Sequence, residues 1–382
     1  MVNPDGAMLQ PFYAMEILSL AHALEAQGRR VHHLEIGEPG GGAAPEVIAA
    51  AHAALDGPQR YTAAKGMPAL RRRIARLYDE RHGVNVDPER VVVTMGSSSG
   101  FILSFLAGFA PGARIAVTRP GYPAYLNILA SLDLMPVDIP LSPENGWVLT
   151  AEAIAARHAE TPFDGLLFAS PANPTGATID AEGFAAIVST CARLGVRLIS
   201  DEIYHGLSFS GRDVSALEHT DEAIVVNSFS KYYGMTGWRV GWLMLPPDMV
   251  RRAEMMAQSL FISASSLSQS AALAALDATD HCEAEKARYA ENRTVLVAGL
   301  RALGFMLPSD PPGAFYAYAD VSGLTDDSMA FCKAMLEEAG VAATPGADFD
   351  RVDGARFVRF SFAGPREDMD GALAGLRHFL KR

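Results

Sequence analysis

Short apolar runs alternate with helical patterns through the middle of the chain. Most of these runs are rich in β-branched residues, which is typical of strands covered on both faces. We expect strands at Val91–Met95, Arg114–Thr118, Met135–Ile139, Gly165–Ala169, Val196–Ser200, Ala223–Asn227 and Val240–Met244. Helical stretches such as Ala181–Leu194 lie between several of them. The pattern predicts an α/β fold, a three-layer sandwich around a mostly parallel seven-stranded sheet whose last strand is antiparallel.

After about residue 285 the pattern changes to that of a smaller α+β unit. We expect a long helix over 282–304, a strand within 308–321, a helix at Asp327–Ala339 and a strand at Arg356–Phe362. Near the N-terminus, helical spacing predicts a helix over 15–30 that stops near Gly28. Each end of the chain is too small to bury a core alone. We therefore predict a large domain over 45–288 and a small domain formed by 1–44 and 289–382.

Charge and composition exclude several classes of function. The chain of 382 residues has 32 basic and 44 acidic residues, a formal net charge of -12. This argues against nucleic-acid binding, which needs a basic face, and against an anionic membrane surface. No apolar run is long enough to span a membrane, and the N-terminus lacks the pattern of a secretory signal. We expect a cytoplasmic protein.

The three cysteines and the histidines suggest no structural cross-link or metal. Cys191, Cys282 and Cys332 are far apart and odd in number, so no disulfide framework is expected. No cluster of histidine, cysteine and aspartate has convincing metal spacing. We expect no metal site.

A Gly/Ser turn follows the first predicted strand of the sheet. It runs from Gly96 to Gly100 and includes Ser97 and Ser98. In open α/β sheets, ligands bind beyond the carboxyl ends of the strands. A turn of this kind that opens a helix offers free N–H groups and hydroxyls to a phosphate. An ordinary serine helix cap has the same sequence pattern.

Three later strand ends carry further polar residues. Asn173 lies in Ser-Pro-Ala-Asn-Pro-Thr-Gly (170–176), Asp201 is followed three residues later by Tyr204, and Ser228 is followed three residues later by Lys231. Arg239 lies eight residues beyond that lysine. Taken singly, these are a tight turn, a helix N-cap and a solvated charge. Together they form a much rarer pattern, which favours a single site.

These motifs resemble those of the class I and II aminotransferases of fold type I. The resemblance also covers Ile-Gly-Glu-Pro (36–39), Arg-Tyr-Thr (60–62) and Val-Arg-Phe-Ser-Phe (358–362), in order and over nearly the whole chain. It implies the PLP-dependent transferase fold and pyridoxal 5'-phosphate (PLP) as cofactor. It also implies amino-acid and 2-oxo-acid substrates.

The resemblance assigns cofactor-binding roles. Lys231 would form the Schiff base with PLP and, once freed, move the substrate proton. Asp201 would keep the pyridine nitrogen protonated so that the ring accepts electrons. Asn173 and Tyr204 would hydrogen-bond the phenolic oxygen. The phosphate would be held by Ser97, Ser98, Ser228 and Arg239, the last through a bidentate fork.

Four further residues are assigned by the same resemblance. Tyr122 would stack on the ring, although a loop aromatic covering the core is the alternative. Tyr61 would reach the neighbouring subunit's cofactor, which implies a homodimer. Arg359 would grip the substrate carboxylate, with help from Gly37 and Asn173. A surface arginine is the alternative for Arg359, because apolar Val358 and Phe360 face the opposite side of that strand.

The expected reaction is a ping-pong transamination. The apolar segment 12–15 favours neutral or hydrophobic amino donors, with 2-oxoglutarate or pyruvate as acceptor; Lys65 is the one candidate partner for an acidic side chain. A PLP-dependent C–S lyase on the same scaffold is the first alternative. A ligand-sensing module is the second, but it would need a DNA-binding segment ahead of Gly37, where too few residues are available.

Overall fold

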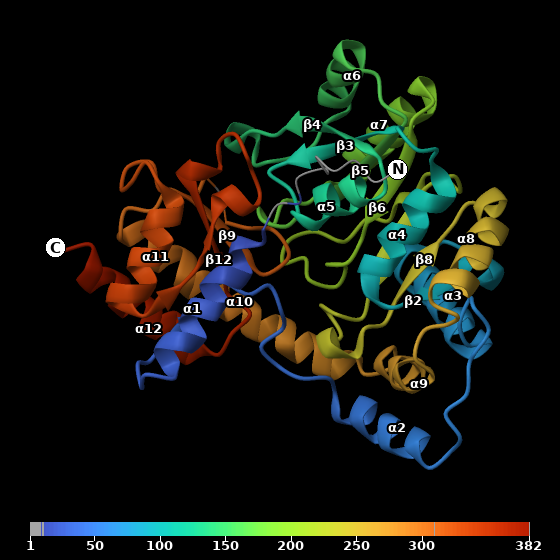
Figure 1. The fold of residues 1–382 in the computed structure, drawn as a ribbon, viewed down its shortest axis with the longest axis horizontal. Coiled ribbons are helices and arrows are strands. Elements are labelled where there is room, and N and C mark those ends of the chain that lie inside the picture. The colour runs from blue at the N-terminus through green and yellow to red at the C-terminus, as the bar shows by residue number, and fades with distance from the viewer. Residues whose placement is uncertain (1–8, 10, 309, 382) are drawn as a thin grey trace.

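A seven-stranded sheet forms the centre of the larger lobe in the computed structural model, which describes residues 9, 11–308 and 310–381 (Figure 1). The strand order is β2-β8-β7-β6-β5-β3-β4. The strands are β2 (Val91–Thr94), β3 (Arg114–Arg119), β4 (Met135–Pro140), β5 (Gly165–Ala169), β6 (Arg197–Asp201), β7 (Ile224–Ser228) and β8 (Gly241–Met244). Only β8 runs antiparallel to its neighbours, β2 and β7. The predicted α/β sheet and its antiparallel last strand are confirmed.

Alternate strand residues enter two separate hydrophobic cores, one on each face of the sheet. Ile199 and Val226 belong to one core, whereas Leu198 and Val225 belong to the other. All four side chains are buried. This explains the nearly continuous apolar runs, because a strand covered on both faces needs apolar residues at every position.

Helices cover both faces and complete the three layers (Figure 1). The helices of this lobe are α2 (Pro45–Leu55), α3 (Pro68–His82), α4 (Gly96–Gly108), α5 (Ala124–Ser131), α6 (Ala151–Glu160), α7 (Ala181–Leu194), α8 (Pro247–Leu260) and α9 (Ser266–Ala275). Of these, α2 packs mainly against α9. The core that contains Ile199 also takes side chains from α4 and α8, such as Phe101 and Met249. The other core takes side chains from α3, α6 and α7.

The smaller lobe joins the two ends of the chain. A three-stranded antiparallel sheet has the order β11-β12-β9, and β1 pairs in parallel with β10. These strands are β1 (His32–His33), β9 (Tyr316–Asp320), β10 (Val341–Ala342), β11 (Thr344–Pro345) and β12 (Phe357–Ser361). Three helices pack beside them, α1 (Tyr13–Glu25), α11 (Ser328–Ala339) and α12 (Arg366–Phe379). The pairing of β1 with β10 ties the N-terminal segment to the C-terminal unit.

A single helix, α10 (Thr279–Ala302), runs from one lobe to the other (Figure 1). The expected boundary between residues 288 and 289 falls inside this helix, so the division into domains remains a prediction. Helix α1 begins two residues before the expected start and ends at Glu25, ahead of Gly28, which has a φ of 82°. Among the described residues, no helix has the length and hydropathy needed to cross a membrane.

Candidate active site

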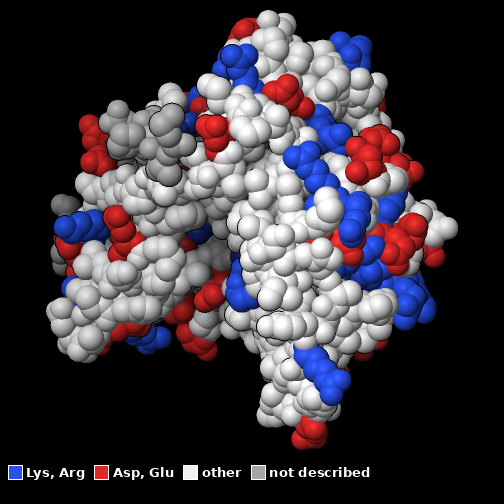
Figure 2. Space-filling model, turned by 45° about the vertical axis from the view of Figure 1, so that its right-hand side comes forward, with Lys and Arg blue, Asp and Glu red and all other residues white. Residues whose placement is uncertain are grey.

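A cavity of about 280 Å³ lies where the carboxyl ends of the large sheet meet the smaller lobe. Figure 2 shows the surface hollowed between the two lobes. Both lobes contribute to the lining, which includes Phe12, Gly37, Ser97, Ser98, Tyr122, Asn173, Asp201, Tyr204, Lys231, Arg239, Asp348 and Arg359. Ten of these twelve residues, all but Phe12 and Asp348, are site residues that the sequence predicted. The strand ends therefore bring together residues far apart in the sequence, as the topology of parallel strands requires.

Lys231 follows β7 and places its amine at the edge of the cavity. Its Nζ donates a hydrogen bond to the backbone carbonyl of Gly37. Loss of hydration, together with the positive charges of Arg359 and Arg239, lowers the pKa of this amine to about 8, although Glu38 and Asp201 raise it. More of this amine is therefore uncharged near neutral pH than in an ordinary lysine, as a nucleophile or proton acceptor requires.

Asp201 is the last residue of β6 and is buried in the floor of the cavity. Its carboxylate accepts a hydrogen bond from the Tyr125 hydroxyl and another, of 3.0 Å, from the backbone N–H of Ile203. Burial raises the pKa of Asp201 to about 6, although these two hydrogen bonds lower it. Because no helix begins here, the N-cap interpretation of Asp201 is wrong. The sequence did not single out Tyr125, whose signal was its place in the same Pro-Gly-Tyr-Pro-Ala-Tyr segment as Tyr122.

Tyr204 meets a second tyrosine that sequence reasoning missed. The hydroxyls of Tyr204 and Tyr316 are 2.7 Å apart, and both side chains are buried. The Tyr316 hydroxyl also lies against Gly37, where an added Cβ would be 2.1 Å away. Glycine at position 37 is therefore required for this close approach. In the sequence, Tyr316 has the pattern of an ordinary core aromatic on a strand.

Arg359 on β12 points into the site and not to solvent. It is 4% exposed, and its Nη1 donates to Asn173 Oδ1 at 3.0 Å. Its Nη2 donates to the Glu35 carbonyl at 2.5 Å and to Thr344 Oγ1 at 3.2 Å. The guanidinium carbon lies 4.3 Å from the centre of the Tyr316 ring. The surface-arginine alternative is therefore wrong, and the guanidinium is fixed in one orientation.

The opposite end of the cavity has the composition of an anion site. Helix α4 begins at Gly96 and presents Ser97 and Ser98 to the cavity beside Arg239. Gly96 has a φ of 71°, and a Cβ there would lie 2.5 Å from Arg239 Nη2. The arginine thus packs directly on the start of the helix, where free N–H groups favour negative charge.

Two expected phosphate or cofactor residues lie outside this lining. The Ser228 hydroxyl is buried, 2.8 Å from the Ser230 hydroxyl and 3.0 Å from the Val240 carbonyl. Ser230, which the sequence analysis passed over, lines the cavity in its place. Tyr61 is 80% exposed, between α2 and α3. The roles given to Ser228 and Tyr61 remain predictions.

Lys65 and the glycine run at residues 40–42 have local structural roles. Lys65 forms an ion pair with Glu89 and is not among the cavity-lining residues. Gly40 lies against the Ala363 carbonyl, where an added Cβ would be 2.2 Å away. Gly41 lies against the Glu285 carboxylate, with a corresponding distance of 2.3 Å. Close packing therefore accounts for these two glycines.

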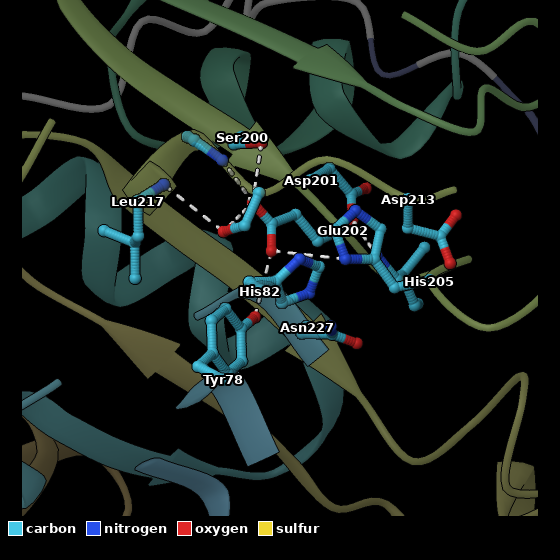
Figure 3. A network of polar contacts seen from close by, with 12 residues as sticks. Tyr78, His82, Ser200, Asp201, Glu202, His205, Asp213, Leu217 and Asn227 are labelled. Atoms are coloured by element: carbon cyan, nitrogen blue, oxygen red, sulfur yellow. Dashed lines mark hydrogen bonds and ion pairs between the residues drawn. The ribbon is translucent and has the colours of Figure 1, made fainter. Parts of the chain in front are cut away.

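A second buried polar cluster, which we call the Glu202 network, lies behind Asp201 (Figure 3). The Glu202 carboxylate accepts hydrogen bonds from the Tyr78 hydroxyl (2.9 Å), the Ser200 hydroxyl (3.2 Å), the Ser215 hydroxyl (2.9 Å) and the Ala216 N–H (3.0 Å). Burial raises the pKa of Glu202 to about 8 in spite of these donors. The network ties the end of β6 to α3 and to the segment after residue 214, and so fixes the strand end that carries Asp201.

No group of three or more histidine, cysteine, aspartate or glutamate side chains suited to a metal ion occurs in the described part of the chain.

Comparison with known proteins agrees with this geometry. The family described as Aminotransferase class I and II matches residues 29–376. The valine–pyruvate aminotransferase of Mycobacterium tuberculosis is 46% identical over 98% of this chain and 97% of its own. A crystal structure of an aminotransferase from Mycobacterium tuberculosis superimposes with a TM-score of 0.94 at 45% identity, covering 97% of both chains. The aspartate aminotransferase from Thermus thermophilus with maleate gives a TM-score of 0.91 at 29% identity, also covering 97% of both chains.

Each of these relatives is named as an aminotransferase, and none as a C–S lyase or a regulator. The match extends over nearly the whole chain and includes the strand-end motifs and both lobes. This chain belongs to the class I and II aminotransferases, and is an enzyme that transfers an amino group between amino acids and 2-oxo acids.

Proposed function

We propose that this aminotransferase uses PLP held by Lys231 and takes neutral, apolar amino acids as donors, with pyruvate or 2-oxoglutarate as acceptor. One observation carries the proposal: the Lys231 amine, the Asp201 carboxylate and the Arg359 guanidinium line one cavity. Family membership supports the cofactor. The M. tuberculosis relative, named for valine and pyruvate, supports the substrate class.

The residues present fit PLP at both ends of the cavity. The start of α4, Ser98 and Arg239 form a cradle for a phosphate, and the lack of a side chain at Gly96 lets the Arg239 guanidinium pack against the start of the helix. Asp201 has two hydrogen-bond donors and lone pairs left for a protonated ring nitrogen. Lys231 supplies the amine.

The chain's own groups then have separable tasks. PLP, when bound, supplies a ring that accepts the electrons released at the substrate α-carbon. Arg359 holds the substrate carboxylate by charge and orients the α-carbon. Lys231 Nζ, uncharged in part at neutral pH, takes the α-proton and returns it. Asp201 holds a compensating negative charge at the floor of the cavity.

The lining of the cavity supports neutral donors. Its cationic side chains are Lys231, Arg239 and Arg359, which all have tasks in the proposed scheme. Lys65, the candidate partner for an acidic side chain, pairs with Glu89 instead. Phe12, Ala14, Met15, Ile36 and Phe349 add apolar surface.

A homodimer is part of the proposal. Tyr61 is exposed and lies outside the lining of its own cavity. Exposed Ile48 and Leu55 on the adjacent α2 offer apolar surface for a second copy. Buried, unpaired cysteines support the cytoplasm as the compartment.

An absorbance spectrum of the purified protein tests the proposal. We expect a near-ultraviolet or visible band after PLP is supplied, which shifts on addition of valine or alanine without an acceptor. Aspartate should shift it less at equal concentration. A protein that shows no band with PLP would contradict the cofactor, and a stronger response to aspartate would contradict the donor class. Release of ammonia and pyruvate without an acceptor would indicate a lyase.

A further inference from the structure

Helix α1 begins without a cap of its own. Its N-cap position is Phe12, whose side chain cannot accept a hydrogen bond. The first N–H groups of a helix lack partners within the helix and need an acceptor from elsewhere. Asp348, more than 300 residues away in sequence, supplies it: Oδ1 accepts from the Tyr13 N–H at 2.8 Å and Oδ2 from the Ala14 N–H at 3.0 Å. The helix dipole adds to this interaction with a carboxylate.

Asp348 is held in place by the larger lobe. It is buried, in the turn that follows β11. Directly after it, the Phe349 carbonyl accepts a hydrogen bond of 3.0 Å from the Gly121 N–H. Arg119 at the end of β3 also donates to Asp350 Oδ1 at 2.6 Å and to Asp353 Oδ2 at 3.0 Å. The position of the capping carboxylate is therefore set relative to the large sheet.

The first turn of α1 forms part of the cavity wall. Phe12, Ala14 and Met15 all line the cavity, as does Asp348. The Phe12 ring meets the Tyr122 ring edge to face, with centroids 6.4 Å apart. This contact brings the smaller lobe's N-terminal segment against the residue expected to stack on the cofactor. The position of the apolar wall thus depends on how the helix start is held.

The other end of α1 is anchored independently. His33 Nε2 lies 3.2 Å from Glu25 and its Nδ1 lies 2.8 Å from Glu35. These carboxylates raise the pKa of His33 to about 9, so the ring is charged at neutral pH. Ile17, Ala21 and Leu24 are buried against the core. Loss of the cap should therefore loosen the first turn and leave the rest of the helix in place.

We propose that Asp348 is a positioning residue that sets donor side-chain specificity by capping α1 and thereby fixing Phe12, Ala14 and Met15 as the apolar wall of the cavity. The proposal rests on the apolar donor class proposed above. It names the group that holds the wall in place. The residue acts through the helix and need not touch the reacting atoms.

Hydrogen exchange with Asp348→Ala tests the cap directly, whatever the enzyme's substrate. We expect faster exchange of the Tyr13 and Ala14 amides, by about tenfold, and little change over residues 17–25. Asp348→Asn should give an intermediate effect, because the amide has one acceptor oxygen in place of two. Asp327→Ala is the matched control, since Asp327 caps α11 in the same lobe through the Met329 and Ala330 N–H groups and is not among the cavity-lining residues. Unchanged exchange at Tyr13 and Ala14 in Asp348→Ala would overturn the proposal.

Steady-state kinetics tests the specificity. In Asp348→Ala we expect KM for valine to rise about tenfold, KM for alanine to rise less, and kcat to fall little for either. Asp327→Ala should keep both KM values. Equal losses with valine and alanine would overturn the specificity role. If the parent enzyme itself showed no preference for apolar donors, the proposed function would fail while the exchange result on the cap would still stand.

Discussion

Asp201 and Glu202 are adjacent buried carboxylates at the end of one strand, and they differ in what surrounds them. Asp201 has two donors and faces the cavity. Glu202 has four donors and lies in the Glu202 network. Burial raises both pKa values, to about 6 and about 8. A buried carboxylate with bonding capacity left over and an open side is available for a ligand, whereas one whose capacity is used by the protein holds the structure together.

The largest expected effect is on the cavity side, in Lys231→Ala. We expect turnover to fall by at least about a thousandfold, because the variant has no amine to hold the cofactor or move the α-proton. The free energy of unfolding should not fall, since the charged form of this amine is penalised by burial. Initial rates and urea denaturation measure the two quantities. Lys65→Ala is the control for loss of a lysine, and its turnover should stay unchanged. Normal activity in Lys231→Ala would contradict the assignment of Lys231 as the catalytic amine.

Asp201→Asn should cost less than loss of the lysine, with kcat lower by about a hundredfold. The amide keeps the shape and can still accept from Tyr125 or Ile203, but it lacks the negative charge at the floor of the cavity. The absorption band with PLP should persist while donor-dependent turnover drops. Glu202→Gln is the matched control: a similar loss of kcat there would mean that the two carboxylates do not differ in the way described.

Glu202→Gln should act on stability and not on turnover. The NH2 group of the glutamine is a hydrogen-bond donor, and it would face a site that already contains four donors. This mismatch should lower the free energy of unfolding by about 2 kcal/mol. The kcat per folded molecule should stay near that of the parent. Chemical denaturation followed by fluorescence measures the free energy of unfolding. Initial rates divided by the titrated concentration of active enzyme give the kcat per folded molecule. An unchanged denaturation midpoint would show that the Glu202 network contributes little to stability.

The cavity side of this comparison could be predicted from the sequence, and the network side could not. Lys231, Asp201 and Asn173 follow apolar runs, and parallel strands bring such positions to one edge of the sheet. Arg359 and Gly37 needed the family resemblance, since their strand and loop have no pattern that indicates a cleft. The sheet itself was predictable because strands covered on both faces give long apolar runs.

Long-range pairings account for what the sequence did not indicate. Glu202 directly follows Asp201, which the sequence singled out, but its donors come from segments as distant as Tyr78. Asp348 caps a helix more than 300 residues away through backbone N–H groups, which have no sequence signal at all. Tyr316 has the alternation of a core strand, and its role near Gly37 follows only from the way the N-terminal segment packs on the C-terminal unit. Such contacts depend on tertiary packing and not on local patterns.

The smallest expected effect is a difference in pH dependence, which tests the protonation of Glu202. With a pKa near 8 in the folded protein and 4.5 unfolded, Glu202 stabilises the fold fully below pH 4.5 and loses this contribution as pH rises to about 8. His33 has a pKa near 9 in the folded protein and 6.5 in the unfolded chain. Its stabilising contribution is therefore also lost as the pH rises, in this case above pH 6.5. The stabilising contribution of Asp201 is lost in the same direction, between pH 3.8 and about pH 6. The parent curve alone therefore cannot isolate Glu202.

The difference between parent and Glu202→Gln isolates this contribution, because His33 and Asp201 titrate in both proteins. We expect the variant's deficit in the free energy of unfolding to be largest near pH 5 and to shrink steadily towards pH 8. Urea denaturation at pH 5, 6.5 and 8 measures it. A deficit that stays constant across this range would mean that the four donors outweigh burial and keep Glu202 ionised. In that case Glu202 would be a buried charge neutralised by hydrogen bonds, and the contrast with Asp201 would depend on access to the cavity alone.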